Sequence, residues 1–379
     1  MLAAVSVGGL LLLVPADATS EASWEQWEHL PGVLDLAGPL PDGSLVAVAG
    51  GQLKSLHSDG TVSGYTGQVA APGAESYLAG SSGRRVEAAG CTFAADDLFW
   101  LRLAPPLGIV RVDRQGAVRP FADFPGVESL SGIVSDRVGR FGYRLLVTGV
   151  HLGKTVLEAF DCRGKSTLIT SAAPLLEGGL AVAPATFGDY AGQLIAADEN
   201  SGAILALSPA GGWSVIADSG IPKGGDIGVE SAGFVPPGFA AGGWAYLADR
   251  GTPGNPHPGT DSVLRVSARD LRRAGVQEGD LLVASEGGGV TVAVRCKPAC
   301  SVREVAVGPP AGHIEGHLLA VADHPGRATA AAAASSSAWS LPVLALVLLL
   351  TAAYYLVRLR RRRVSGAPGT AQPAARSAG

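Results

Sequence analysis

A short pattern recurs five times along this chain: an aliphatic residue, then Glu, then Ser, Gly or Ala. The five copies begin at Val86, Val127, Leu176, Val229 and Ile314. Their glutamates follow one another at intervals of 41, 49, 53 and 85 residues. Periods of this size are typical of folds in which one supersecondary unit is repeated and packs against its neighbours. The repeat therefore restricts the chain to a modular architecture.

The segments between these copies have the pattern of short β-strands. Apolar and polar residues alternate, and Gly, Pro, Asp and Asn separate the runs at spacings too short for helices. Residues 192–220 match residues 279–308, each as three antiparallel strands joined by Gly-containing hairpins. A four-stranded sheet fits the first three intervals. The prediction is an all-β fold, a β-propeller of about six blades, or seven if the longest interval contains another blade.

The remaining parts of the ring are less regular. Asp35 is a sixth equivalent of the repeated glutamates and precedes a further hairpin. Closure is predicted to join the strand around residues 318–321 to N-terminal strands, because an open ring exposes strand edges. The longest interval is expected to contain an insertion, with an irregular loop at 250–260 and a helical turn at 267–274.

Strands of small residues with a Glu at the start of the innermost strand resemble those of a broad group of six-bladed propellers. This group includes the gluconolactonase, paraoxonase and NHL-type families, and the resemblance covers most of the predicted domain as architecture. In the gluconolactonase group a Glu-Gly-Pro at this position supplies a metal ligand. Glu177-Gly178 and Glu315-Gly316 match its first two residues and lack the Pro. The resemblance thus implies a channel that can hold a cation.

Both ends of the chain carry apolar segments. Residues 1–18 end in a small-x-small cleavage pattern and are predicted to be a signal peptide, with an uncleaved anchor as the alternative. Residues 338–357 are twenty residues without a charge, which is the length of a membrane-spanning helix. Five arginines follow within residues 358–363, so the positive-inside rule predicts a cytoplasmic C-terminus. The chain is expected to be a single-pass protein of the plasma membrane.

These segments define the remaining domains. Residues 21–327 are predicted to form the extracellular propeller, residues 328–337 an Ala/Ser-rich spacer, and residues 358–379 a basic cytoplasmic tail. The formal net charge of −4 gives the extracellular part no basic surface, which excludes nucleic acid as a partner.

Four cysteines in an exported domain predict disulfides. Cys296 and Cys300 flank a Lys-Pro turn and are expected to pair. Cys91 and Cys162 could then pair by elimination, or remain buried free thiols.

The inner strands of a propeller line a central channel, so residues at one repeated position converge on its axis. The predicted ring consists of Asp35, Glu87, Glu128, Glu177, Glu230 and Glu315. Close carboxylates raise one another's pKa, and a bound hard cation would relieve this, with Ca²⁺ the first choice outside cells. The alternative is that each acid accepts hydrogen bonds from a neighbouring blade and joins adjacent inner strands.

Two further groups of residues are candidates for function. His313, Glu315 and His317 alternate along a predicted strand, so their side chains should share one face and could bind Zn²⁺, a less favoured ion here than Ca²⁺. Long loops on one face of a propeller commonly contact partners or substrates. The candidate recognition loop contains Asp249, Asn255, His257 and Asp261.

The sequence has no nucleophile elbow, phosphate-binding loop, dinucleotide fingerprint or His-Glu-x-x-His motif. The first hypothesis is a cell-surface propeller that binds an extracellular ligand or protein partner, with a structural cation in the channel and no catalytic turnover. The alternative is a metal-dependent hydrolase of lactonase type, in which a channel cation polarises a carbonyl group and a histidine transfers protons. The cation would be held by Glu177, Glu230 and Glu315, and the histidine would be His313 or His317.

Overall fold

A computed structural model describes residues 21–323. The predicted signal peptide, spacer, membrane-spanning helix and cytoplasmic tail lie outside these residues. Among the residues that are described, no helix is long and apolar enough to cross a membrane. The one α-helix of this part, α1 (Ala268–Arg273), lies where the sequence predicts a helical turn.

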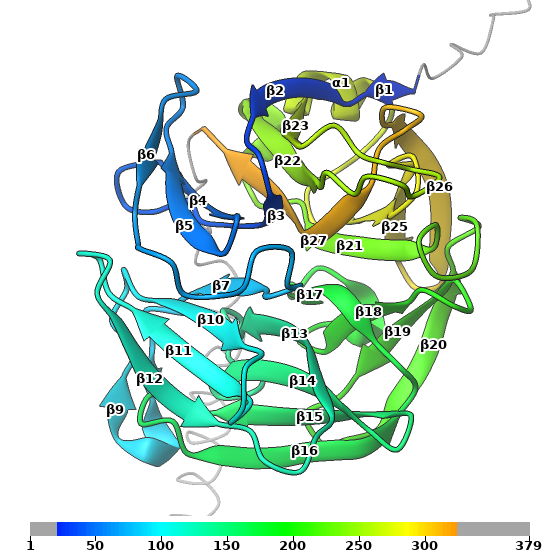
Figure 1. The fold of residues 1–379 in the computed structure, drawn as a ribbon. Coiled ribbons are helices and arrows are strands. Elements are labelled where there is room, and N and C mark those ends of the chain that lie inside the picture. Colours follow the sequence, from blue (N-terminus) through cyan, green and yellow to red (C-terminus); the bar gives the residue numbers. More distant parts are fainter. Residues whose placement is uncertain (1–20, 324–379) are drawn as a thin grey trace, which may run out of the picture. The chain divides into compact units, whose positions relative to one another are not determined.

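Six sheets are arranged as blades around a common centre (Figure 1). Blade 1 contains, from the innermost strand outward, β3 (Val33–Ala37), β4 (Leu45–Ala49), β5 (Gln52–Leu56) and β6 (Val62–Gly64). In the same order, blade 2 contains β7 (Leu78–Gly80), β10 (Leu98–Arg102), β11 (Gly108–Val112) and β12 (Val118–Asp123). Blade 3 contains β13 (Ser129–Ser135), β14 (Leu145–His151), β15 (Lys154–Phe160) and β16 (Ser166–Ala173).

Blade 4 contains β17 (Glu177–Val182), β18 (Leu194–Asp198), β19 (Ala203–Leu207) and β20 (Trp213–Asp218). Blade 5 contains β21 (Val229–Phe234), β24 (Leu281–Ser285), β25 (Thr291–Cys296), β26 (Cys300–Val307) and, parallel to β26, β1 (Ala22–Ser23). Blade 6 contains β27 (Ile314–Ala322), β22 (Gly243–Asp249), β23 (Ser262–Ser267) and β2 (Glu25–His29). The six-bladed propeller predicted from the repeat is confirmed.

Blades 5 and 6 are interleaved along the chain. After β21 the chain leaves blade 5, forms β22 and β23 of blade 6, and passes through α1 before it returns to β24. The longest interval between repeated glutamates therefore contains two strands of blade 6 and three of blade 5, and it does not contain a seventh blade. The prediction of a simple insertion at this point is wrong, although the irregular loop after β22 is present.

The ring closes in blade 6. Its innermost strand, β27, comes from the C-terminal end of the described chain, and its outermost strand, β2, comes from the N-terminal end. The predicted joining of the two ends is confirmed. Since β1 also pairs with β26, the N-terminal segment holds both blades 5 and 6 from outside.

Small residues in the inner strands let the blades approach closely at the centre. A Cβ at Gly132 of β13 would lie 2.8 Å from Cδ1 of Leu180 in β17, and a Cβ at Gly179 would lie 2.6 Å from the backbone nitrogen of Ala232 in β21. Because contacts this short are not tolerated, larger residues at these positions would push neighbouring blades apart. Leu, Ile, Val and Ala fill the layers between the blades, as in the fully buried β4 and β24.

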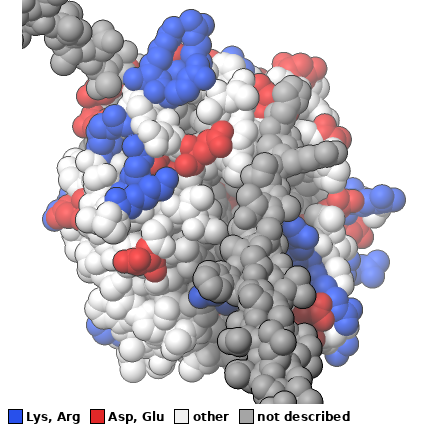
Figure 2. Space-filling model, turned by 180° about the vertical axis from the view of Figure 1, so that it is seen from behind, with Lys and Arg blue, Asp and Glu red and all other residues white. Residues whose placement is uncertain are grey.

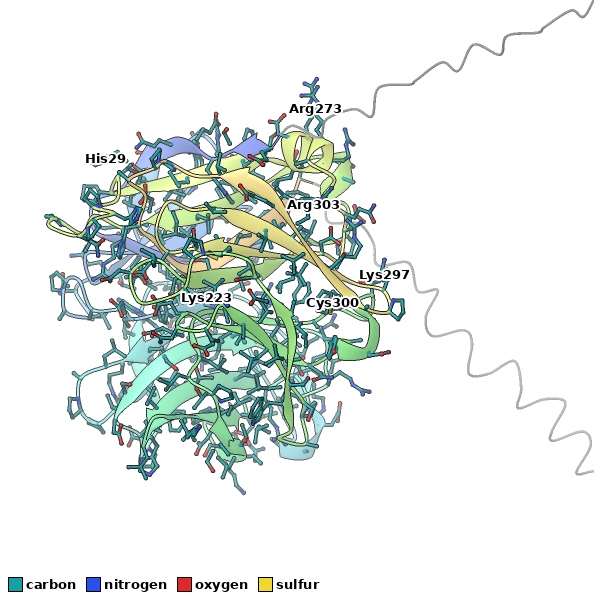
Figure 3. All side chains as sticks on the ribbon, turned by 90° about the vertical axis from the view of Figure 1, so that its right-hand side faces the viewer. His29, Lys223, Arg273, Lys297, Cys300 and Arg303 are labelled. Carbon is teal, nitrogen blue, oxygen red and sulfur yellow. A yellow bond between two sulfur atoms is a disulfide. The ribbon has the colours of Figure 1, made fainter. Side chains whose placement is uncertain are left out.

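Both disulfides form. Cys91–Cys162 links an additional hairpin of blade 2, made by β8 (Arg85–Val86) and β9 (Cys91–Thr92), to the end of β15 in blade 3. Cys296–Cys300 closes the hairpin between β25 and β26, and Figure 3 shows Lys297 and Cys300 at the outer edge of the molecule. The pairing of Cys296 with Cys300 and the open alternative of a Cys91–Cys162 pair are thus confirmed.

The surface carries charges of both signs. On the face seen in Figure 2, Lys and Arg side chains lie among Asp and Glu side chains. This mixture accords with the formal net charge of −4 for the whole chain.

Candidate functional site: a carboxylate cluster in the channel

Three of the predicted ring acids are buried in inner strands. Asp35 of β3, Glu230 of β21 and Glu315 of β27 expose 0%, 3% and 3% of their surface. Beside each of these acids, the pairing of the inner strand with the next strand of the blade is irregular. The register shifts between Val33 and Asp35 in blade 1 and on either side of Glu230 in blade 5. In blade 6 it shifts next to Glu315, between the pairs Tyr246–Leu319 and Ala248–Glu315. Bulges change the direction in which a side chain points, and here they occur where the acids face the channel.

Tyr77 connects opposite sides of the channel. Its hydroxyl group lies 3.2 Å from Oε1 of Glu230 in blade 5 and 3.2 Å from Oε2 of Glu315 in blade 6, although Tyr77 itself directly precedes β7 of blade 2. Burial raises the pKa of Tyr77 well above its ordinary value, and both glutamates add to the rise. The phenol therefore remains protonated and donates a hydrogen bond within the cluster.

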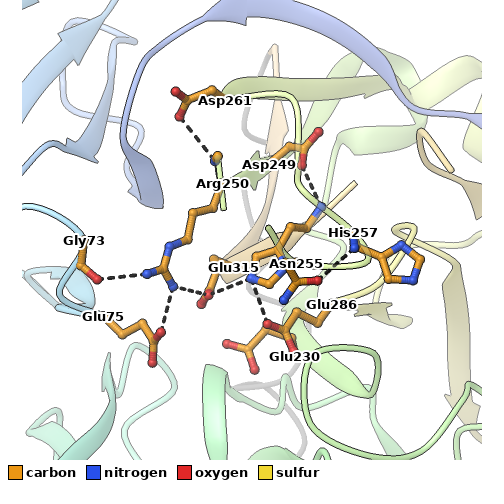
Figure 4. A network of polar contacts seen from close by, with 12 residues as sticks. Gly73, Glu75, Glu230, Asp249, Arg250, Asn255, His257, Asp261, Glu286 and Glu315 are labelled. Atoms are coloured by element: carbon orange, nitrogen blue, oxygen red, sulfur yellow. Dashed lines mark hydrogen bonds and ion pairs between the residues drawn. The ribbon is translucent and has the colours of Figure 1, made fainter. Parts of the chain in front are cut away.

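Arg250 reaches the same cluster from the loop that follows β22 (Figure 4). Its Nη1 atom donates to Glu75 and to Glu315, at 2.7 Å each, and its Nη2 atom donates to the carbonyl group of Gly73 at 2.9 Å. Glu75 and Gly73 precede β7, so Arg250 links blade 6 to blade 2 across the mouth of the channel. It also compensates part of the charge of Glu315.

His313, Glu286 and Glu315 form the tightest group, with ligand atoms that all lie within 4.8 Å of one another. Nε2 of His313 lies 2.9 Å from Glu286 and 3.5 Å from Glu315. Burial alone would lower the pKa of His313, but the two carboxylates outweigh it and raise this pKa to about 10. Nδ1 of His313 is buried and has no hydrogen-bond partner in the described part of the protein. Two carboxylates and an imidazole in this arrangement could hold a metal ion.

Glu177 and Glu199 extend the cluster toward solvent. Glu177 is exposed at its surface, but the protein around its carboxyl group removes part of its hydration. This desolvation, followed by repulsion from Glu75, Glu315 and Glu286, raises the pKa of Glu177 to about 7. Burial and a hydrogen bond with Glu286 raise the pKa of Glu199 to about 8. A cavity of about 500 Å³ opens beside them, with Glu75, Leu130 and Asn200 also in its wall. Strongly shifted carboxylates beside a cavity are typical of functional sites.

Asp35 has a different role from the glutamates. Its carboxylate accepts hydrogen bonds from the backbone nitrogens of Leu36 at 2.8 Å, Leu78 of blade 2 at 2.6 Å and His317 of blade 6 at 2.7 Å. This is the arrangement of the alternative hypothesis, in which the acid joins adjacent inner strands, and the structure supports it at Asp35.

Two predicted ring members are not among the interacting glutamates of the cluster, although Glu128 lines the cavity of about 500 Å³ beside it. Glu87 belongs to the short 3-10 helix η1 (Glu87–Ala89) between β8 and β9, is exposed, and pairs with Arg85. Glu128 precedes β13, is exposed, and accepts a hydrogen bond from the backbone nitrogen of Leu152. The prediction that Glu87 faces the channel is wrong, because the copy of the sequence repeat at Val86 belongs to the additional hairpin of blade 2. The inner strand of that blade, β7, instead follows Glu75.

The predicted grouping of His313, Glu315 and His317 is also wrong for His317. Gly316 has a φ of 68°, and the strand bulges there, so strict alternation fails. The Nδ1 atom of His317 lies 3.0 Å from Oδ1 of Asp35, and its ring is directed away from the Glu286 group.

The four named residues of the candidate recognition loop mainly make hydrogen bonds that stabilise the conformation of the loop. Asp249 is buried and accepts hydrogen bonds from the backbone nitrogen of His313 at 2.8 Å and from the hydroxyl of Thr260. Asp261 accepts from the backbone nitrogen of Gly32 at 2.7 Å. Asn255 accepts from the backbone nitrogen of His257 at 2.8 Å, and Nδ1 of His257 lies 3.1 Å from the carbonyl oxygen of Pro310.

Several members of the cluster were missed at the sequence level: Glu75, Tyr77, Glu199, Arg250 and Glu286. Two of them carried a signal. Glu199 and Glu286 occupy the same position in the matching segments 192–220 and 279–308, directly after the second strand of a blade. Their equivalence places both carboxylates at the same end of the channel.

No family model and no curated protein match the sequence of this chain. Among solved structures, it is similar to virginiamycin B lyase from Staphylococcus aureus, with 11% identity, 75% of this chain and 74% of that chain covered, and a TM-score of 0.42. It is also similar to a glucose dehydrogenase-like protein from Thermus thermophilus, with 15% identity, 76% and 86% covered, and a TM-score of 0.42. An auxiliary nutrient binding protein from Bacteroides thetaiotaomicron matches with 10% identity, 72% and 57% covered, and a TM-score of 0.44. The chain's own sheet arrangement shows a six-bladed β-propeller.

Proposed function

We propose that this protein is a cell-surface propeller that binds a divalent cation at the acidic end of its channel and uses that end to bind an extracellular ligand. The observation that carries the proposal is the group formed by Glu286, His313 and Glu315, whose ligand atoms lie within 4.8 Å of one another. An isolated buried carboxylate is expensive to ionise, so a cluster of this kind favours a bound cation.

The charge balance of the cluster supports a cation. Six glutamates influence one another there: Glu75, Glu177, Glu199, Glu230, Glu286 and Glu315. Against them the described residues place the guanidinium of Arg250 and the imidazole of His313. Burial, and then repulsion from Glu315, Glu177 and Glu286, raises the pKa of Glu230 well above its ordinary value. Because most of the available ligands are carboxylate oxygens, Ca²⁺ is the proposed ion, and Zn²⁺ is second because His313 adds one nitrogen.

The cell-surface location rests on sequence features and on the disulfides. Residues 1–18 act as the signal peptide, residues 338–357 as the anchor, and residues 358–379 as the cytoplasmic tail in this proposal. Disulfides persist in oxidising compartments, and two of them, Cys91–Cys162 and Cys296–Cys300, lie in the domain that would be extracellular.

The test is metal analysis of the full chain purified in detergent, with the double variant Glu286→Gln/Glu315→Gln beside the wild type. Glu304→Gln, an exposed change in the outer strand β26, is the matched control. We expect one tightly held divalent ion in the wild type and in Glu304→Gln, and none in the double variant. A wild-type protein that remains metal-free after incubation with Ca²⁺ and with Zn²⁺ would refute the cation proposal.

A metal-assisted hydrolase is the second candidate, and the cavity of about 500 Å³ beside Glu177 favours it. A carboxyl group with a pKa of about 7 is suited to proton transfer near neutral pH. The discriminating experiment is an ester and lactone screen with metal-loaded protein. Turnover that Glu177→Gln abolishes, with the metal retained, would support the hydrolase, whereas metal binding without turnover would support the binding protein.

A further inference from the structure

The channel has a second cavity at the end opposite the glutamates. The inner strands β17, β21 and β27 carry Glu177, Glu230 and Glu315 in their first two positions, whereas their last residues line this second cavity. All six inner strands contribute to its wall, and its volume is about 1020 Å³. This is the size of a site for an organic molecule of moderate dimensions.

The cationic groups of this cavity distinguish it from the acidic end. Arg137, Arg265 and His317 line it, together with Asp42 and Asp323. The Asp42 carboxylate is engaged in its own turn, where it accepts hydrogen bonds from the backbone nitrogen and the hydroxyl group of Ser44. The cavity wall therefore carries charges of both signs, and an anionic ligand would depend on an individual cationic group and not on an excess of positive charge.

Arg137 is the member of this set without a carboxylate partner in the described part of the chain. Its Nη2 atom donates to the carbonyl oxygen of Ser81 at 3.3 Å. The guanidinium lies over Gly80 of β7, where a Cβ would be 2.9 Å from Nη2. Arg137 is exposed and lines the cavity, so its guanidinium is accessible to a ligand. A guanidinium without a carboxylate partner can form a charge-assisted, bidentate pair with a ligand carboxylate.

The other two cations are held in place by protein groups. Arg265 stacks over Trp244, with its Cζ atom 4.2 Å from the ring centroid, and its Nε atom donates to Glu25 at 2.8 Å. His317 is paired with Asp35 through Nδ1. Both are thereby fixed at the wall, which reduces the ordering cost of binding.

The rest of the wall is apolar and aromatic. Phe234, Trp244 and Tyr246 face the cavity, with Leu180 and Pro236. Arg137 lies beside blades 2 and 3, whereas the aromatic residues belong to blades 5 and 6. A cavity lined in this way fits a molecule that spans it, with a carboxylate at one end and an apolar ring at the other. We propose that this end of the channel binds an organic carboxylate with an aromatic or apolar body, with Arg137 as the group that receives the carboxylate. The inference is independent of the cation proposed at the other end.

The test uses 2-naphthoate as the probe and its neutral counterpart, 2-naphthamide, as the matched ligand. Saturable binding to the full chain in detergent is measured by isothermal titration calorimetry. We expect 2-naphthoate to bind at least about tenfold more tightly than 2-naphthamide, which corresponds to about 1.4 kcal/mol. Equal affinity of the two ligands, or saturable binding of neither, would overturn the proposal.

The variants locate the site. Arg137→Gln should remove the preference for the carboxylate ligand. Arg119→Gln is an exposed change in the outer strand β12 and should leave the preference intact. This control variant also shows how much of the signal comes from partition of the ligands into micelles. An unchanged preference in folded Arg137→Gln would contradict the assignment, and the acid-to-amide comparison on the wild type remains decisive if that variant does not fold. Glu286→Gln/Glu315→Gln should keep the preference, so failure of the cation proposal and failure of this one are distinguishable.

Discussion

The Nδ1 atom of His317 lies 3.0 Å from Oδ1 of Asp35, and this contact joins the last strand of the propeller to the first blade. The same carboxylate accepts the backbone nitrogens of Leu78 and His317, so three consecutive blades meet at one buried side chain. The closure of the ring thus depends on Asp35 as well as on the pairing of β2 with β23.

Asp35→Asn should destabilise the propeller. An amide cannot accept all of these hydrogen bonds, and it leaves His317 without its counter-ion, so the expected loss is about 3 kcal/mol in the free energy of unfolding. Urea unfolding followed by Trp fluorescence measures it. Asp59→Asn is the control, because Asp59 accepts one backbone hydrogen bond in an exposed turn, and it should unfold like the wild type. An unchanged midpoint in Asp35→Asn would show that the ring closes without this residue.

Substitutions at two glycines should distinguish the cost of steric overlap from the cost of backbone strain. Gly316 and Gly43 both have positive φ, 68° and 85°. A Cβ at Gly316 would overlap the carboxylate of Asp35, whereas a Cβ at Gly43 meets nothing within 4 Å. Gly43→Ala should therefore cost about 1 kcal/mol from strain alone, and Gly316→Ala about 3 kcal/mol or more. The comparison of the two urea midpoints checks this. Equal losses would mean that the close approach of Gly316 to Asp35 contributes nothing.

The two disulfides should differ in their contribution. Cys91–Cys162 spans 71 positions and Cys296–Cys300 spans 4. The entropy of loop closure predicts stabilisation by about 4 kcal/mol for the longer loop and about 2 kcal/mol for the shorter one. Paired Cys→Ser variants, compared in thermal unfolding, measure the difference. A larger effect from the shorter loop would indicate that reduced and unfolded chains keep structure around Cys91 or Cys162.

Chelator-treated protein should lose stability as the pH rises from 5 to 9. The pKa of Glu177 is raised from 4.5 to about 7 and that of Glu199 to about 8, so folding favours their protonated forms, and this contribution is lost as the pH rises through those values. The raised pKa of His313, about 10, acts in the same direction: its contribution is complete below about pH 6.5 and is lost toward pH 10. Differential scanning calorimetry across this range measures the trend.

A bound cation changes that prediction. Because Ca²⁺ takes the place of the protons in the cluster, saturating Ca²⁺ should raise the Tm most at pH 9 and least at pH 5. A chelator-treated protein whose Tm rises between pH 5 and pH 9 would contradict the assigned pKa shifts. Glu304→Gln should follow the wild type at every pH.

The sequence was sufficient for the fold class because the repeat and the period-two strands are local signals. It also indicated that Glu177, Glu230 and Glu315 lie near one another, since one repeated position faces the channel in several blades. Their role as metal ligands stays a prediction. The sequence was not sufficient for Glu75, because blade 2 lacks the pattern at its inner strand and shows it at Glu87 in an added hairpin. Arg250 belongs to an irregular loop, and no periodicity indicates where such a side chain will reach.

The same limit applies to His317. Alternation assumes a regular strand, and a single residue with positive φ reverses the direction of every side chain after it. Gly316 was visible in the sequence, but the close approach of Asp35, a residue far away in the chain, was not. Long-range contacts of this kind are absent from a local pattern.

The interleaving of blades 5 and 6 has a consequence for the order of events during synthesis. The strands β1 and β2 leave the ribosome first, yet their partners β26 and β23 appear only after most of the propeller has been made. The central strand β27 appears last of all the strands described. The chain therefore cannot complete its native state until it is almost fully synthesised. If the domain is exported as proposed, this order keeps the chain unfolded while it passes through a secretion channel. The ring then closes only after the domain has crossed the membrane.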